Sequence, residues 1–70
     1  MSVDRLSLLA GQCATLRAAA GARGDAVAFK AFDRATLRLI WARTELMRGN
    51  HSAARAFAWS ACDLLSLIHV

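Results

Sequence analysis

The chain has 70 residues, of which 57% are hydrophobic, and it carries a formal net charge of +4 at pH 7. A chain of this length forms one domain at most, which excludes a multidomain protein, and it buries too little surface to be comfortably stable alone. We therefore expect apolar surface to remain on the folded monomer, where another polypeptide covers it.

The N-terminus and the cysteines predict a cytoplasmic protein. Residues 1–5 lack the basic region and the long apolar run of a secretory signal peptide. The chain has two cysteines, Cys13 and Cys62, and in a reducing compartment such residues usually pack in the core. The longest apolar run, Leu64 to Val70, is interrupted by polar residues and is too short to span a membrane. We expect no membrane contact.

Glycines divide the chain into three segments that are rich in Ala, Leu and Arg, the residues that favour helix. Gly21 and Gly24 form one break, Gly49 forms the other, and the sequence has no proline. We predict an all-α fold, in which an N-terminal helix precedes a helical hairpin and two copies form a homodimeric bundle. The single domain covers residues 1–70, with helices at about 3–20, 26–48 and 52–68.

The first predicted helix covers about residues 3–20. Ser2 can cap it, and Asp4 suits the positive end of the helix dipole. Apolar residues at alternating spacings of three and four form one stripe, which we expect to be buried. These residues are Leu6, Leu9, Cys13, Leu16 and Ala20. Gly21 or Gly24 ends the helix in a left-handed conformation.

The second predicted helix, about residues 26–48, has Asp25 as its N-cap and Gly49 as its stop. Its buried stripe contains Ala28, Phe32, Ala35, Leu39, Ala42 and Leu46. On a helical wheel, two apolar residues lie opposite this stripe within a basic field. The six residues that we predict to bind a partner are Leu37, Trp41, Lys30, Arg34, Arg38 and Arg48.

An aromatic residue and a leucine with a charged rim have the composition of an interface hot spot. Two alternatives remain open for this face. The helix can be the middle element of an open array, with the first helix packed on one side and the third on the other. The same face can also pair with a second copy of the chain, because so short a chain needs additional cover.

The third predicted helix, about residues 52–68, is capped by Asn50 or Ser52. Its centre line consists of Ala54, Ala58, Ala61 and Leu65, and the small residues allow a close approach of two helix axes. The Gly49-Asn50 turn predicts an antiparallel hairpin. The C-terminal end is apolar almost all round, and self-association is its simplest cover. We predict a dimer interface at Trp59, Leu64, Leu67 and Ile68.

Residues 49–61 are similar to the second helix of a tetratricopeptide repeat, with a glycine turn followed by Ala54 and Ala61 at the positions of close packing. One hairpin is too few for a solenoid, so the resemblance implies a packing geometry and no function. The same segment is similar to a helix-turn-helix. Its recognition helix offers only His51, Ser52 and Arg55 before it becomes apolar, which is few polar side chains for reading base edges.

No group of residues in the sequence predicts catalysis, a cofactor or a metal. The carboxylates are scattered, at Asp4, Asp25, Asp33, Glu45 and Asp63, and no two of Cys13, Cys62, His51 and His69 have metal-ligand spacing. We expect Asp33 to pair with Lys30 or with a neighbour of Arg34, and Glu45 to pair with Arg48.

These patterns predict a non-enzymatic adaptor or regulator that binds and occludes another protein through a helical face. The basic face suits a partner with an acidic surface. Small bacterial regulators and phage-encoded inhibitors share this size and composition. The alternative is a small basic DNA-binding regulator that contacts phosphates through the helix at 26–48.

Overall fold

A computed structural model describes residues 1–68, which form three α-helices. Helix α1 covers Val3–Ala22, α2 covers Ala26–Met47 and α3 covers His51–Ser66. The described part of the chain contains no strand. The all-α prediction of three helices packed against each other is confirmed. The sequence-based interpretation of His69 lies outside the described residues.

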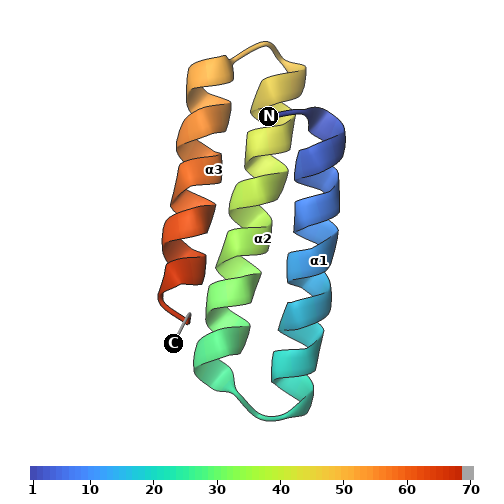
Figure 1. Cartoon of the computed structure of the whole chain (residues 1–70), viewed down its shortest axis with the longest axis vertical. Coiled ribbons are helices and arrows are strands. Elements are labelled where there is room, and N and C mark those ends of the chain that lie inside the picture. Colours follow the sequence, from blue (N-terminus) through green and yellow to red (C-terminus); the bar gives the residue numbers. More distant parts are fainter. Residues whose placement is uncertain (69–70) are drawn as a thin grey trace.

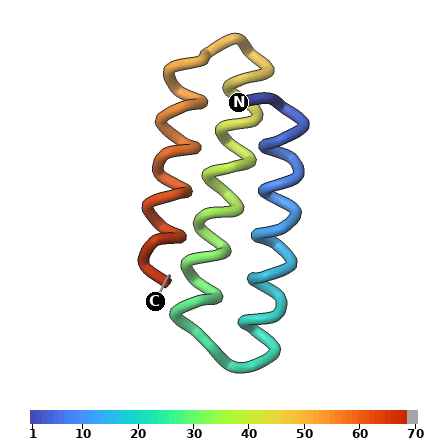
Figure 2. The backbone as a smooth tube through the Cα atoms, viewed as in Figure 1, coloured from blue at the N-terminus to red at the C-terminus, as the bar shows by residue number. Residues whose placement is uncertain are grey.

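Helix α2 is the central element of the fold (Figure 1). Successive helices run antiparallel and are joined by short turns at opposite ends of the molecule, as the backbone trace shows (Figure 2). Both α1 and α3 pack against α2. The backbones of α1 and α3 do not come within contact distance of each other, so over residues 1–68 the three helices form an open array.

Local hydrogen bonds explain where α1 and α2 begin. The Ser2 Oγ accepts a hydrogen bond of 3.1 Å from the backbone N–H of Arg5. The Asp25 Oδ1 accepts one of 3.0 Å from the N–H of Ala28. Each bond satisfies a backbone donor that has no partner within its helix. Between the two helices, Gly24 has a φ of +74°, which a residue with a Cβ rarely adopts.

The turn between α2 and α3 is organised by Glu45. Gly49 has a φ of +83° and ends α2, which runs to Met47. Asn50 is the N-cap of α3, but its side chain makes no capping hydrogen bond. Its amide Nδ2 instead donates to Glu45 Oε2 at 2.7 Å, and Arg48 Nη1 donates to Glu45 Oε1 at 3.1 Å. The predicted pair of Glu45 and Arg48 is confirmed.

The core is built mainly from small side chains. Its buried hydrophobic residues are Leu6, Cys13, Ala20, Ala28, Ala31, Ala35, Leu39, Ala42, Ala54 and Ala61. Four of these alanines and one leucine belong to α2, so the axes of α1 and α3 can approach this helix closely. The side chains of Leu6 and Cys13 meet Ala61 at the centre, where they join residues of all three helices in one cluster.

Three residues that we expected in the core are exposed. Leu9 and Leu16 belong to the predicted stripe of α1, and Cys62 was expected to be a core thiol, but all three lie at the surface. These residues are exposed because α1 and α3 both pack on α2 and do not cover each other's adjoining sides. The expected pairing of Asp33 within α2 is also wrong, since its Oδ1 accepts a hydrogen bond of 2.9 Å from Arg17 Nη1 of α1.

Candidate partner-binding face of α2

Helix α2 has one buried side and, opposite to it, one exposed side. Ala28, Ala35 and Ala42 mark the buried side. On the helical wheel the opposite side carries five of the six predicted partner-binding residues. We call it the outer face of α2, and it consists of Lys30, Arg34, Leu37, Trp41 and Arg48, all of them exposed. The structure thus brings these residues onto one continuous surface.

Trp41 is the centre of the outer face. Its ring lies edge-on to Phe57 of α3, with centroids 5.6 Å apart and an angle of 63° between the ring planes. The guanidinium carbon of Arg38 lies 5.0 Å from the centroid of the Trp41 ring. Trp41 nevertheless keeps 42% of its surface accessible. The indole is therefore held in one orientation while much of it remains available to a partner.

Arg38 is the sixth predicted residue, and it lies at the edge of the outer face, where α2 meets α3. Its Nε donates a hydrogen bond of 3.3 Å to Ser60 Oγ of α3. The side chain is half-buried, and it connects the two helices while it covers the Trp41 ring. A guanidinium so engaged positions the tryptophan, and its stem adds apolar contact.

The positive charge along the outer face is uneven. Lys30 and Arg34 are exposed in the N-terminal half of α2, and Leu37 follows one turn after Arg34. At the other end, Arg48 is paired with Glu45, whose carboxylate offsets part of its charge. The most strongly basic stretch therefore lies beside Leu37 and Trp41 on their N-terminal side.

The sequence pattern led us to expect Phe29, Ile40 and Met47 at the edge of the buried stripe of α2, and it gave no role to Val27. Val27, Phe29, Ile40 and Met47 are all exposed. Val27 continues the Trp41 side of the helix, whereas the other three lie along the edge towards α1. Helical spacing alone placed residues of this kind beside the buried stripe. They are exposed because, among residues 1–68, no further helix covers this part of α2. The exposed apolar surface of α2 therefore extends beyond the outer face, on the side towards α1.

The predicted dimer residues do not form one surface. Leu64, Leu67 and Ile68 line a hollow of about 190 Å³ between α2 and α3, together with Val27, Lys30, Ala31 and Arg34. Trp59 lies apart from them, beside Ser52, Arg55 and Ala56, and is 71% exposed. Three of the four residues therefore adjoin the basic stretch of the outer face, and the fourth belongs to another side of α3.

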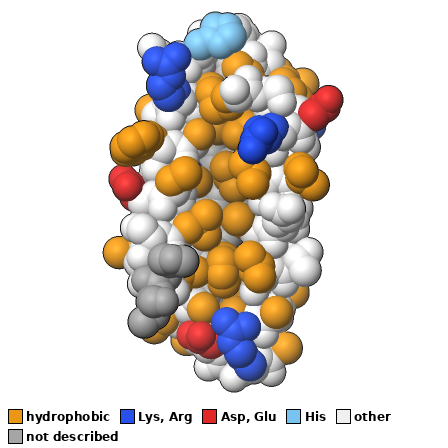
Figure 3. All heavy atoms as spheres, viewed as in Figure 1, with side chains coloured by type: hydrophobic (Ala, Val, Ile, Leu, Met, Phe, Trp, Pro, Cys, Tyr) orange, Lys and Arg blue, Asp and Glu red, His pale blue; other side chains and the backbone are white. Residues whose placement is uncertain are grey.

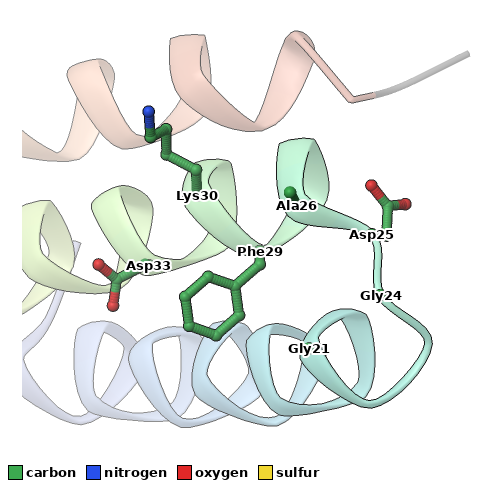
Figure 4. Close-up of a pocket in the computed structure, with 7 residues that line it drawn as sticks. All are labelled: Gly21, Gly24, Asp25, Ala26, Phe29, Lys30 and Asp33. Carbon is green, nitrogen blue, oxygen red and sulfur yellow. The ribbon is translucent and has the colours of Figure 1, made fainter.

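A second hollow of about 480 Å³ lies at the turn between α1 and α2 (Figure 4). Phe29 extends towards α1 and covers Gly21, where an added Cβ would lie 3.3 Å from the ring. The two carboxylates that line this hollow already have partners, since Asp25 caps α2 and Asp33 pairs with Arg17. We find here an apolar depression whose acidic groups have structural roles.

Residues 1–68 contain neither a cluster of metal-binding side chains nor a helix that could span a membrane. No group of three His, Cys, Asp or Glu side chains lies close enough to bind one metal ion. Over the same residues, no helix combines the length and the apolar composition needed to cross a membrane.

Comparison with protein families, curated proteins and solved structures gives no match.

The two thiols differ in their surroundings. Cys13 is buried in the central cluster, and burial raises the pKa of its thiol above the ordinary value, with a smaller contribution from Cys62. Cys62 is exposed on α3. A raised pKa keeps the Cys13 thiol protonated and poorly nucleophilic, so Cys13 acts as a small core residue.

Proposed function

We propose that this chain is a non-enzymatic helical regulator that forms a homodimer and binds another protein through the outer face of α2, occluding the surface that it covers. One observation carries the proposal. Trp41 is fixed by Arg38 and Phe57, yet 42% of its surface is accessible among basic side chains. Tryptophan and arginine are the residues that most often dominate binding energy at protein interfaces.

The fixed position of Trp41 favours binding because less side-chain freedom is lost when a partner arrives. Immobilising a flexible side chain at an interface costs about 0.5–1.5 kcal/mol. Here Phe57 and Arg38 already hold the ring in the unbound protein. Burial of the remaining indole surface then contributes to affinity with little ordering cost.

The spacing on α2 suits insertion of one helix face into a groove. Lys30, Arg34, Leu37 and Trp41 follow one another at intervals of four, three and four residues, which is the anchor spacing of helix-in-groove recognition. The apolar residues in the middle would enter a hydrophobic cleft. Lys30 and Arg34 would meet carboxylates at its edge. The partner that we propose therefore has an apolar cleft with an acidic rim.

Affinity capture from a lysate of the source organism tests this proposal with a matched pair of variants. Trp41→Ala removes the fixed indole, and Trp59→Ala removes an indole that is 71% exposed on α3 and lies outside the outer face. We expect a partner that wild type and Trp59→Ala retain and that Trp41→Ala loses, with an affinity loss of at least 2 kcal/mol. Equal capture by all three forms would remove the outer face from the proposal.

A second candidate function is contact with nucleic acid phosphates, and it is favoured by the four basic side chains on and beside the outer face, Lys30, Arg34, Arg38 and Arg48. Helices α2 and α3 lie antiparallel, unlike the roughly 90–120° arrangement of a helix-turn-helix (Figure 1). Contacts would therefore be independent of base sequence.

A gel-shift series over salt concentration separates the two candidates. Four phosphate contacts would give a slope of roughly −4 for the logarithm of the binding constant against that of salt concentration. The nucleic-acid candidate would be favoured if the chain binds DNA with such a slope and if Arg34→Ala weakens that binding. If duplex DNA is not retained even at the lowest salt concentration, the nucleic-acid candidate is excluded.

A further inference from the structure

A second apolar surface lies on the side of the molecule where α1 and α3 flank the core. Figure 3 shows that hydrophobic side chains form a stripe down the middle of this side, along the long axis, while acidic side chains lie at its margins and basic side chains lie at its two ends and beside the stripe in the upper half. We call this surface the α1–α3 face. It contains Leu9, Leu16, Ala58, Cys62 and Leu65.

Helix geometry places Leu9 and Leu16 on this face. They lie four residues before and three residues after the buried Cys13, so they adjoin it on the surface of α1. The other edge of α1 is turned to α2, because Arg17 pairs with Asp33 there and Gly21 lies beneath Phe29. Leu9 and Leu16 therefore lie on the edge away from α2, and both are exposed.

The same reasoning applies to α3. Ser60 accepts a hydrogen bond from Arg38 and so marks the edge that faces α2. Cys62 lies two residues later and is exposed on the other side, near enough to Cys13 of α1 to contribute to its raised pKa. Ala58 and Leu65 pack on the central cluster from this side and remain half-buried. Both helices thus expose apolar side chains towards one common surface.

We propose that the α1–α3 face is where two copies of the chain pair, through a twofold interface that covers Leu9, Leu16 and Cys62. This inference rests on the homodimer of the proposed function and names its surface. It replaces the C-terminal interface that the sequence predicted, and it leaves the outer face of α2, on the opposite side, free for the acidic partner.

The size of the face agrees with this assignment. The chain exposes 4700 Å², whereas a globular monomer of 7.5 kDa typically exposes roughly 4200 Å². The Cα atoms of the whole chain extend 38 by 18 Å along their two longest axes, a projected area of roughly 700 Å², which is of the same order as the ~800 Å² that each partner buries in a standard stable interface. One copy of the chain is therefore large enough to cover the stripe of another.

Charge and symmetry identify the occupant as a second copy. The stripe runs along the middle of the face, so a twofold axis that lies in the plane of the interface, parallel to the stripe, lays the apolar residues of one copy on those of the other (Figure 3). Charges of both signs around the stripe can then pair across the interface. By contrast, the hollow lined by Leu64 and Leu67 adjoins Lys30 and Arg34, which would repel the same residues of another copy.

Sedimentation equilibrium on the full chain tests the assignment with two variants. Leu16→Glu places a charge on the α1–α3 face at a residue that is 47% exposed, and Leu67→Glu places the same charge at the C-terminal site, where the residue is 74% exposed. We expect a dimeric wild type, a dissociation constant raised at least 100-fold by Leu16→Glu, and an unchanged constant in Leu67→Glu.

Each contrary result has a distinct meaning. A monomeric wild type at millimolar concentration overturns the homodimer and this inference with it, while the partner-binding role of the outer face is unaffected. A dimeric wild type in which Leu16→Glu remains equally dimeric overturns only the assignment to this face. If Leu67→Glu weakens the dimer as much as Leu16→Glu does, the assignment to this face is also overturned.

Alkylation of Cys62 in the wild-type protein gives a second test that does not depend on the folding of a variant. Cys62 is exposed in the monomer, and the proposed interface covers it. The rate of iodoacetamide modification should fall at least tenfold as protein concentration rises through the dimer dissociation constant. A rate that is independent of concentration in a dimeric protein would place Cys62 outside the interface and overturn the proposal.

Discussion

The guanidinium carbon of Arg38 lies 5.0 Å from the centroid of the Trp41 ring, one turn further along the same helix. Arg38 also donates to Ser60 of α3, so the side chain that joins two helices also fixes the aromatic residue. The packing of α2 on α3 and the proposed recognition by the outer face of α2 therefore share one side chain.

Replacing Arg38 should loosen Trp41 and lower stability together. Arg38→Ala removes the stacking contact, worth about 0.5–1 kcal/mol, and the hydrogen bond to Ser60. We expect a loss of about 1 kcal/mol in the free energy of unfolding and easier acrylamide quenching of Trp41. The quenching is measured in a Trp59→Phe background so that Trp41 is the sole fluorophore.

Arg38→Lys is the matched control for charge, because an ammonium keeps the positive charge but lacks the planar fork. It should lose most of the same stability. If lysine restores both the stability and the protection of Trp41, then charge alone holds the ring and the stacking geometry is unimportant.

The ion pair of Arg17 and Asp33 should contribute little despite its distance of 2.9 Å. The side chains are 36% and 42% exposed, and water and salt screen such pairs. A double-mutant cycle with Arg17→Ala and Asp33→Ala should give a coupling free energy of about 0.2–1 kcal/mol that falls as salt is added. A coupling well above this range that persists in 1 M salt would show that the pair is effectively desolvated.

Local features of the fold were predictable from sequence because neighbouring residues determine them. Asp25 caps α2 by bonding a backbone N–H three residues away. Gly24 and Gly49 supply positive φ angles at the two breaks. The Glu45 pair with Arg48 spans less than one helical turn. Each of these interactions is decided within a few residues of chain, so composition and spacing suffice to predict it.

Features that depend on the relative position of the helices were not predictable. Asp33 bonds Arg17 rather than Lys30 because α1 lies along that edge of α2, which spacing within α2 does not reveal. Leu9 and Leu16 have the spacing of core residues but are exposed, since α3 does not reach them. The residues of the outer face of α2 could be predicted from their spacing in the sequence. The contacts that fix Trp41 could not, because they depend on how α3 packs against α2.

Enlarging the alanines of α2 should disrupt the bundle. Ala35 and Ala42 are fully buried where α1 and α3 approach this helix. Ala35→Leu adds three carbon atoms to a packed site and should cost about 1–3 kcal/mol, a large part of the stability of so small a domain. Urea unfolding followed by circular dichroism measures the loss. Ala19→Leu at an exposed position of α1 is the control and should change stability by less than about 0.5 kcal/mol.

Two glycine replacements should have opposite effects on stability. Gly49→Ala introduces a Cβ at a φ of +83° and should lower the free energy of unfolding by about 1 kcal/mol. Gly11 lies in α1, where an added Cβ meets no atom within 4 Å. Gly11→Ala should therefore raise the free energy of unfolding by about 0.5–1 kcal/mol through better helix propensity. Thermal unfolding of the two variants checks the signs, and a stabilising Gly49→Ala would contradict the assigned turn geometry.

The buried thiol of Cys13 should make the protein less stable at alkaline pH. Burial raises its pKa above the ordinary value of 9.0, so the folded state holds this proton more tightly than the unfolded state does. Below about pH 9 the thiol is protonated in both states, so it does not change the free energy of unfolding. Above that pH the unfolded state releases the proton first, and the free energy of unfolding falls as pH rises. Urea titrations at pH 7 and pH 10 should show this fall in wild type and a smaller fall in Cys13→Ala. Cys62→Ala should retain most of it, because burial is the larger cause of the shift. An equal fall in Cys13→Ala and wild type would assign the alkaline loss to other groups.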